Sequence, residues 1–142
     1  MKVIRETVTI PTEERTEFLD ITKQIREAIS KHEIQDGLLV LNSLHTTSAV
    51  FVNEFQAAII EDLKGLLQRL VKERDGYRHD DPRVSDCERG NAHSHLRSML
   101  LGRSVVVGIS GGELSLGRFQ SIILCELDGP RDRSLDIQLM GT

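Results

Sequence analysis

The sequence predicts a fold of both strands and helices, because two strand-like runs are each followed by a helix-like stretch and the last third of the chain is almost entirely strand-like. Residues 2–10 follow the two-residue period of a strand, and a second alternating run covers 38–52. Apolar residues at helical spacing fill the stretches next to these runs. With 142 residues, the chain suits one domain, residues 1–142, and leaves no room for a second.

The first strand ends at Pro11, because proline donates no hydrogen bond to a sheet. A helix is expected next, with Asp20 as its N-cap and its end near His32. The apolar residues that predict it are Phe18, Ile21, Ile25, Ala28 and Ile29.

Asp36-Gly37 marks a turn, and a long strand is expected over 38–52. Asn53 followed by Gln56 resembles a capping box, so a helix is predicted from about Glu54 to Arg74. Its apolar stripe is the strongest helical signal in the chain: Ile59, Ile60, Leu63, Leu66, Leu67, Leu70 and Val71.

The stretch 75–90 is polar and poor in hydrophobic residues, which is typical of a lid or a binding segment. Asn91 is the expected N-cap of a short helix that ends at Leu101, with Gly102 at its C-terminal cap. Strands are predicted for the remainder, around a turn at 111–112 and a second turn at DGPRDR: 104–109, 114–116, 119–127 and 135–140.

Composition excludes several protein classes. Charged residues make up 28% and hydrophobic residues 39%, ordinary values for a globular protein. The net charge of -4 argues against general nucleic-acid or anionic-membrane binding. Cys87 and Cys125 form no CxxC pair, which argues against a zinc ribbon or a disulfide scaffold. No signal peptide or membrane span is recognisable, so we expect a cytoplasmic protein.

Four polar residues, His45 to Ser48, interrupt the hydrophobic run of the predicted 38–52 strand. A buried polar group needs a hydrogen-bond partner once it leaves water. These residues therefore either satisfy one another in the core or face a site. The two-residue period cannot decide whether the face of His45 or that of Thr46 is involved.

His45, His79 and His95 come from different predicted elements, and three such ligands with an open fourth position are typical of catalytic zinc. Their spacing is unspecific, so ordinary polar or core histidines are at least as plausible. His93 and His95 cannot both face one site from a regular helix. We expect His95 to point inward beside Leu96 and Met99, and His93 to be exposed.

Other polar residues have two interpretations. Asn53 and Glu54 fit a helix start as well as a site. Asp80 and Asp81 fit solvated loop carboxylates or partners that orient His79. Arg131 and Arg133 in DGPRDR suit bidentate anion binding or a solvated turn.

Taken together in order, HTTSA, NE, YRHD, NAHSHLRSMLLG, LSLGRFQ and ELDGPRDR resemble the YjbQ family, also called secondary thiamine-phosphate synthases. The resemblance covers about Val3 to Gly141. It implies an α+β fold in a single YjbQ-like domain, with mainly antiparallel, β-sandwich-like sheets, two longer helices and one short helix. It also implies a homotrimer with a polar, often metal-bound pocket near the subunit boundary. The site positions that it implies are His45, Thr46, Asn53, Glu54, His79, His95 and Gln120.

The activity that the resemblance implies joins hydroxymethylpyrimidine diphosphate and a thiazole phosphate, and releases pyrophosphate. A divalent metal, Zn or Mg, held by His45, His79 and His95 would assist, with Glu54 also catalytic. Arg131 and Arg133 are the expected cations for the phosphorylated substrate. The chain departs from the family at Arg118-Phe119, where members commonly have Thr-Trp. The alternative is a non-catalytic trimeric module that binds a small anionic metabolite or a metal.

Overall fold

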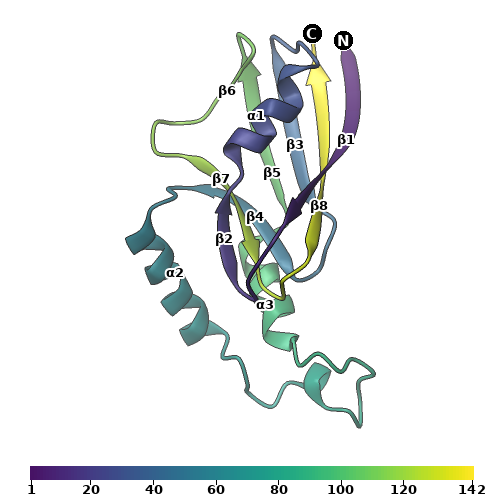
Figure 1. Ribbon diagram of the computed structural model, residues 1–142, viewed down its shortest axis with the longest axis vertical. Helices are drawn as coiled ribbons and strands as arrows, with labels where there is room; N and C mark the ends of the chain where they lie inside the picture. The colour runs from purple at the N-terminus through teal and green to yellow at the C-terminus, as the bar shows by residue number, and fades with distance from the viewer.

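Two antiparallel sheets form the framework of the molecule in the computed structural model, which describes residues 1–142 (Figure 1). The larger sheet has the strand order β1-β8-β3-β5-β6. Its strands are β1 (Lys2–Pro11), β8 (Asp132–Gly141), β3 (Gly37–Ser43), β5 (Ser104–Ser110) and β6 (Glu113–Leu114). The smaller sheet has the order β2-β7-β4, made of β2 (Glu17–Asp20), β7 (Ser121–Glu126) and β4 (Ser48–Asn53).

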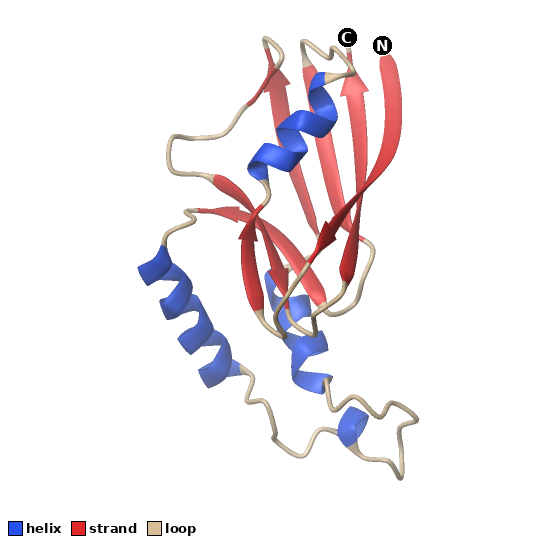
Figure 2. Ribbon diagram, viewed as in Figure 1, coloured by secondary structure: helices blue, strands red, loops and turns tan.

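Three α-helices and one 3-10 turn complete the chain: α1 (Thr22–Ser30), α2 (Ala57–Leu70), η1 (Arg78–Asp80) and α3 (Ala92–Leu101). Helix α1 lies along the larger sheet, whereas α2 runs beside the smaller one (Figure 2). Helix α3 lies at the lower end of the smaller sheet in this view, and the long loop with η1 extends beyond it. None of the helices is long and apolar enough to pass through a bilayer.

The main core lies between α1, one face of the larger sheet and one face of the smaller sheet, which contributes Val50, Ile122 and Leu124. Ile21 and Ile25 are fully buried there against β3 and β8 residues such as Leu39 and Leu139. The opposite face of this sheet has no covering helix and leaves apolar side chains exposed: Val3, Leu38 and Val106. A smaller core of six buried residues lies on the other face of the smaller sheet, where Phe18 and Ile123 pack with Leu67 of α2.

The predicted α+β class with mainly antiparallel sheets is confirmed, and so is the first strand. The single strand over 38–52 is wrong. The chain forms β3, breaks at 44–47 and continues as β4 in the other sheet. The Ser43 and Ser48 hydroxyls lie 2.8 Å apart across this break, so polar groups at the corner satisfy one another. The polar interruption in the sequence therefore marks the change of sheet.

The first helix starts later than predicted, because Phe18 belongs to β2 and α1 begins at Thr22. Asp20 still serves the helix start, since the backbone N–H of Thr22 donates to its carboxylate at 3.0 Å. Ile21, however, holds the N-cap position. The helix ends at Ser30, close to the predicted end.

The second helix is shorter than predicted, and Asn53 does not cap it. Gln56 is the N-cap, and its side chain accepts a hydrogen bond from the Ile59 backbone N–H at 3.0 Å. The apolar stripe is also only partly buried: Leu67 is covered, whereas Leu66 and Leu70 are exposed. The stripe thus predicted the helix correctly without predicting a packed face.

The predictions for the second half of the chain agree better with the structure. Gly102 caps α3 with a φ of 94°, and Gly111 and Gly112 turn between β5 and β6 with positive φ. Strand β7 begins at Ser121 rather than at Phe119, and β6 has only two residues.

A fully buried ion pair joins the ends of β7 and β8. The Arg133 Nε donates to both carboxylate oxygens of Glu126, at 2.9 and 3.0 Å. Its Nη2 also donates to the carbonyl and the hydroxyl of Thr47, at 3.0 and 2.9 Å. The Thr12 hydroxyl donates to Glu126 at 2.7 Å. Arg133 therefore connects the corner between β3 and β4 to both sheets.

We expect the Arg133→Met variant to lose about 3–5 kcal/mol of unfolding free energy, because the Glu126 carboxylate would stay buried without its cation. The double variant Arg133→Met/Glu126→Leu should recover most of this loss. Urea unfolding followed by circular dichroism measures both. Arg5→Met is the control, since the Arg5 side chain is 69% exposed beside Asp136 and should change stability by less than about 1 kcal/mol. Equal losses in Arg133→Met and Arg5→Met would contradict the importance of the buried pair.

Candidate functional site

The corner between β3 and β4 lies against the segment that joins β7 to β8. The Leu127 backbone N–H donates to the Thr47 carbonyl at 3.1 Å, and the Leu44 N–H donates to the Ser134 carbonyl at 3.2 Å. This follows from the register of the smaller sheet, where Ser48 pairs with Glu126. The HTTS and DGPRDR motifs, more than 80 residues apart in the sequence, are thereby neighbours.

Helix α3 is fixed to this junction by two serines on one face. The Ser94 hydroxyl donates to the Leu127 carbonyl at 2.6 Å, and the Ser98 hydroxyl donates to the Ser48 carbonyl at 2.8 Å. Residues four apart share a helix face, so this inward face leaves His93 on one side and His95 on the other.

The prediction that His93 is exposed is wrong. His93 is only 5% exposed, whereas Leu96 and Met99, taken as the inward side, are 38% and 75% exposed. The reason is that α3 packs through its serines and not through its large apolar residues. His95 is partly exposed and faces the polar junction.

His79 and His95 form a close pair of imidazoles. Their ring centroids lie 4.8 Å apart in a T-shaped arrangement. The pKa of His95 lies below its ordinary value because burial disfavours the charged ring and His79 repels a proton, although a hydrogen bond with the Thr46 backbone opposes this. Both rings line a cavity of about 490 Å³, together with Tyr77, Leu96 and Met99. The lowered pKa favours the neutral imidazole of His95 at neutral pH.

Asp80 connects this pair to the start of α3. The Ala92 backbone N–H donates to its carboxylate at 3.1 Å, so Asp80 provides the capping interaction that the sequence assigned to Asn91. The same carboxylate lies 3.8 Å from Nδ1 of His79, a nitrogen that is buried and has no hydrogen-bond partner. Asp81 instead pairs with Arg83 at the surface.

Asp128 is a site residue that the sequence analysis did not single out, although it lies within ELDGPRDR. It is 1% exposed and accepts hydrogen bonds from Arg89 at 2.7 and 3.0 Å and from Asn91 at 2.8 Å. Burial alone raises the pKa of Asp128, but the bonds from Arg89 and Asn91 outweigh it and hold the pKa below its ordinary value. Arg15 and Arg131 approach the same carboxylate to 3.7 and 3.6 Å. Four polar side chains thus converge on one carboxylate behind His95.

His45 is hydrogen-bonded elsewhere. Its Nε2 accepts the Ser134 backbone N–H at 2.8 Å, and its pKa is lowered by burial and then by Arg133 and Arg131. Across the chain, no three His, Cys, Asp or Glu side chains lie close enough together to hold one metal ion. The three histidines proposed as metal ligands therefore do not form a complete ligand set within one chain. His79 and His95 alone offer two neighbouring imidazoles.

The remaining predicted site residues lie at the opposite end of the smaller sheet. Asn53 and Glu54 follow β4, and Gln120 precedes β7, whose Ser121 pairs with Asn53. Because the six residues of β4 are joined by five steps of about 3.4 Å each, about 17 Å separates this end from the HTTS corner. Gln120 accepts the Gly117 N–H at 2.7 Å, and the Asn53 side chain accepts the N–H of Glu54 at the same distance. The predicted residues thus form two groups within one chain.

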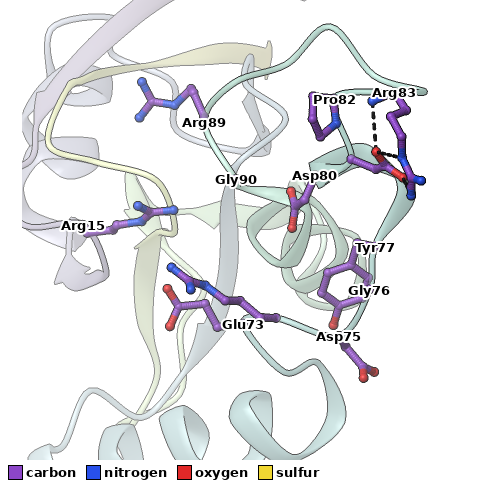
Figure 3. A pocket seen from close by; sticks show the side chains of 12 residues that line it. Arg15, Glu73, Asp75, Gly76, Tyr77, Asp80, Pro82, Arg83, Arg89 and Gly90 are labelled. Carbon is purple, nitrogen blue, oxygen red and sulfur yellow. Dashed lines mark hydrogen bonds and ion pairs between the residues drawn. The ribbon is translucent and has the colours of Figure 1, made fainter.

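The long loop predicted as a lid or binding segment lines a polar pocket of about 650 Å³. Figure 3 shows Arg15 and Arg89 on one side of this pocket and Asp80 and Tyr77 on the other. Twelve residues line it, and only one of them is hydrophobic. The loop therefore contributes charged side chains next to the arginines around Asp128, which are Arg15, Arg89 and Arg131 and are called the Asp128 arginines below.

The sequence matches one protein family over nearly its whole length. Residues 6–142 match the family described as UPF0047 protein YjbQ-like. A UPF0047 protein of Archaeoglobus fulgidus is 38% identical over 133 residues, which cover 94% of this chain and 98% of that protein. A second UPF0047 protein, from Methanothermobacter thermautotrophicus, is 35% identical over 141 residues, which cover 99% of this chain and 94% of that protein.

Solved structures match over nearly the whole chain. A YbjQ-like protein of unknown function from Sulfolobus solfataricus has a TM-score of 0.89 and 30% identity, with 99% of both chains covered. The hypothetical protein APE1520 from Aeropyrum pernix has a TM-score of 0.88 and 36% identity, with 98% of this chain and 99% of that chain covered. Since the family match spans the fold and the motifs together, this chain belongs to the YjbQ-like UPF0047 family.

Proposed function

We propose that the chain is a small-molecule enzyme that acts on phosphorylated substrates at the junction of the HTTS corner, the His79–His95 pair and the DGPRDR turn. The reaction class is the one that the motif resemblance implies. A thiazole nitrogen attacks the methylene carbon of hydroxymethylpyrimidine diphosphate, the carbon–oxygen bond breaks, and pyrophosphate leaves. The observation that carries the proposal is the contact between two imidazoles, whose ring centroids lie 4.8 Å apart in one cavity, with the charge of Asp128 acting on the pKa of His95.

The neutral state of His95 defines what this pair can do. A neutral imidazole can accept a proton or bind a metal, whereas a charged one can do neither. Burial keeps the pKa of His95 low, and the Asp128 arginines supply positive charge nearby. Such charge stabilises a departing diphosphate. Arg131 is partly exposed and can therefore contact a substrate, whereas Arg133 is fully buried in its pair with Glu126.

A divalent cation, Zn or Mg, belongs to the proposal as a ligand of the His79–His95 pair. Two imidazoles are too few for a closed protein site, so the other ligands would come from the substrate diphosphate or from a second copy of the chain. Such an ion would supply charge for the leaving group.

A homotrimer would bring the two separated groups of site residues together. Asn53, Glu54 and Gln120 lie about 17 Å from the HTTS corner in one chain, so they can complete the site only from a neighbouring copy. Uncovered apolar residues on the larger sheet offer a surface for such assembly. We therefore propose that the site is shared between subunits.

A non-catalytic binding module is the second candidate function. The arginines around Asp128 favour it, because guanidinium groups hold anions well without any chemistry. A bound anion would raise thermal stability while no product forms.

We expect Zn²⁺ or Mg²⁺, added with inorganic pyrophosphate, to raise the melting temperature of the wild-type protein by about 5–10 °C at a hundredfold excess over Kd. His79→Ala and His95→Ala should lose this shift, because each removes one imidazole of the pair. Differential scanning fluorimetry measures it. His32→Ala is the control, since His32 pairs with Glu6 away from the site. If both site variants keep the full shift, the pair does not bind the ligand.

Pyrophosphate release from hydroxymethylpyrimidine diphosphate and thiazole phosphate should fall about 100-fold or more in His95→Ala. A coupled phosphate assay measures the rate under saturating substrate. Leu96→Ala is the matched control, because it shortens an adjacent side chain of the same cavity without removing a polar group. An unchanged rate in His95→Ala would refute its catalytic role. A wild-type protein that shows the thermal shift but forms no product supports the binding module.

Mixed oligomers test the shared site. His95→Ala and Glu54→Ala subunits should each be inactive alone and recover about a quarter of the wild-type rate when co-expressed, because sites built from two copies then have an intact pair statistically. Light scattering should give three times the 16.0 kDa of one chain. No recovery in a mixed trimer would place the site within single chains.

A further inference from the structure

We propose that the face of α3 opposite His95 forms a second site that binds a phosphate group. Its residues are His93 and Arg97 from α3, Gln68, Lys72 and Glu73 from the end of α2 and the segment after it, and Arg15 and Thr16 from the β1–β2 connection. These residues surround a cavity of about 430 Å³ that contains no hydrophobic side chain.

The helix geometry separates this cavity from the His79–His95 pair. His93 and Arg97 are four residues apart and share one face of α3, as His95 and Met99 share another. His95 lies two residues, or about 200°, around the helix from His93. The inward serines, Ser94 and Ser98, hold α3 between these two faces. Each face therefore meets its own cavity.

His93 is the observation that points to a ligand. It is 5% exposed, it lines the cavity, and its Nδ1 is buried without any hydrogen-bond partner. Buried polar atoms in native proteins are nearly always paired. A bound group that exchanges hydrogen bonds with this ring would remove the exception.

The charge of the cavity identifies the ligand as an anion. Arg15, Lys72 and Arg97 contribute three positive charges, against the carboxylate of Glu73 and that of Asp128, which lies 3.7 Å from Arg15. Arg97 is only 8% exposed. Its Nε and Nη2 donate hydrogen bonds to the Val71 carbonyl at 3.1 and 2.8 Å, which hold the side chain in place. Its remaining Nη1 is free to donate to a ligand. A fixed guanidinium with two further cations suits the several oxygens of a phosphate group.

The low pKa of His93 agrees with this assignment. Burial lowers it first, and the charge of Arg97 lowers it further, so the ring is neutral and carries one N–H. A neutral imidazole can donate that N–H to a phosphate oxygen. The carboxylate of Glu73 and the more distant Asp80 act in the opposite direction on this ring.

Isothermal titration of the full chain with inorganic phosphate, at low ionic strength and neutral pH, tests the site. We expect saturable binding to the wild-type protein and binding about fivefold weaker in Lys72→Gln, which removes one partly exposed charge. His93→Gln should weaken binding further. Lys23→Gln is the matched control, because Lys23 is an exposed lysine on α1. His95→Ala should bind phosphate as the wild type does, because His95 does not line this cavity, and this result would distinguish the phosphate site from the His79–His95 pair.

A phosphomonoester such as glycerol phosphate forms the second arm of the titration. Binding as tight as that of free phosphate identifies the ligand as the phosphate end of a metabolite, and much weaker binding identifies it as free phosphate. The absence of saturable phosphate binding to the wild-type protein would overturn the proposal. Equal phosphate binding in Lys72→Gln and the wild type would also overturn the proposal. In this variant only an exposed side chain changes, so folding is preserved.

Discussion

The buried ion pair between Glu126 and Arg133 is the interaction on which the arrangement of the site depends. Two charges without solvent need hydrogen-bond partners, and Arg133 binds the carbonyl and hydroxyl of Thr47 in addition to Glu126, which leaves only its Nη1 unpaired. That contact fixes the corner where the chain leaves one sheet for the other. Thr46, adjacent to this fixed residue, then meets His95. A requirement of charge burial thus sets the position of the candidate site.

The sequence predicted the fold class and most elements because periodicity is a local signal. It failed at 38–52, because the two-residue alternation continues across the change of sheet, and the polar interruption from His45 to Ser48 was placed within one strand although it marks the corner. It also misassigned His93, because inwardness was inferred from Leu96 and Met99, whereas α3 packs through Ser94 and Ser98. Small polar residues can bury a helix face when carbonyls from strand ends accept their hydroxyls. Apolar content alone does not reveal that face.

The site residues were predicted less evenly than the fold. The ordered motifs correctly indicated segments that meet, such as HTTS, NAHSH and ELDGPRDR, but they could not show which side chain in each segment has a structural role. Arg133 and Asp128 illustrate the difference. Both lie in one motif and both are buried, yet Arg133 holds the framework and Asp128 gathers the groups behind His95. Distances between segments, such as that from the HTTS corner to Glu54, follow only from the sheet register.

Helix α3 explains how a small chain can support more than one polar site. Its ten residues present three faces: serines toward the sheet, His95 toward His79, and His93 with Arg97 toward the end of α2. Because the serine bonds fix the rotation of the helix, both histidine faces are oriented by the same two contacts. Asp80 at its first turn and Asn91 bound to Asp128 fix its start in the same way. The two histidine faces are therefore mechanically linked through one rigid element, although each contacts a different cavity.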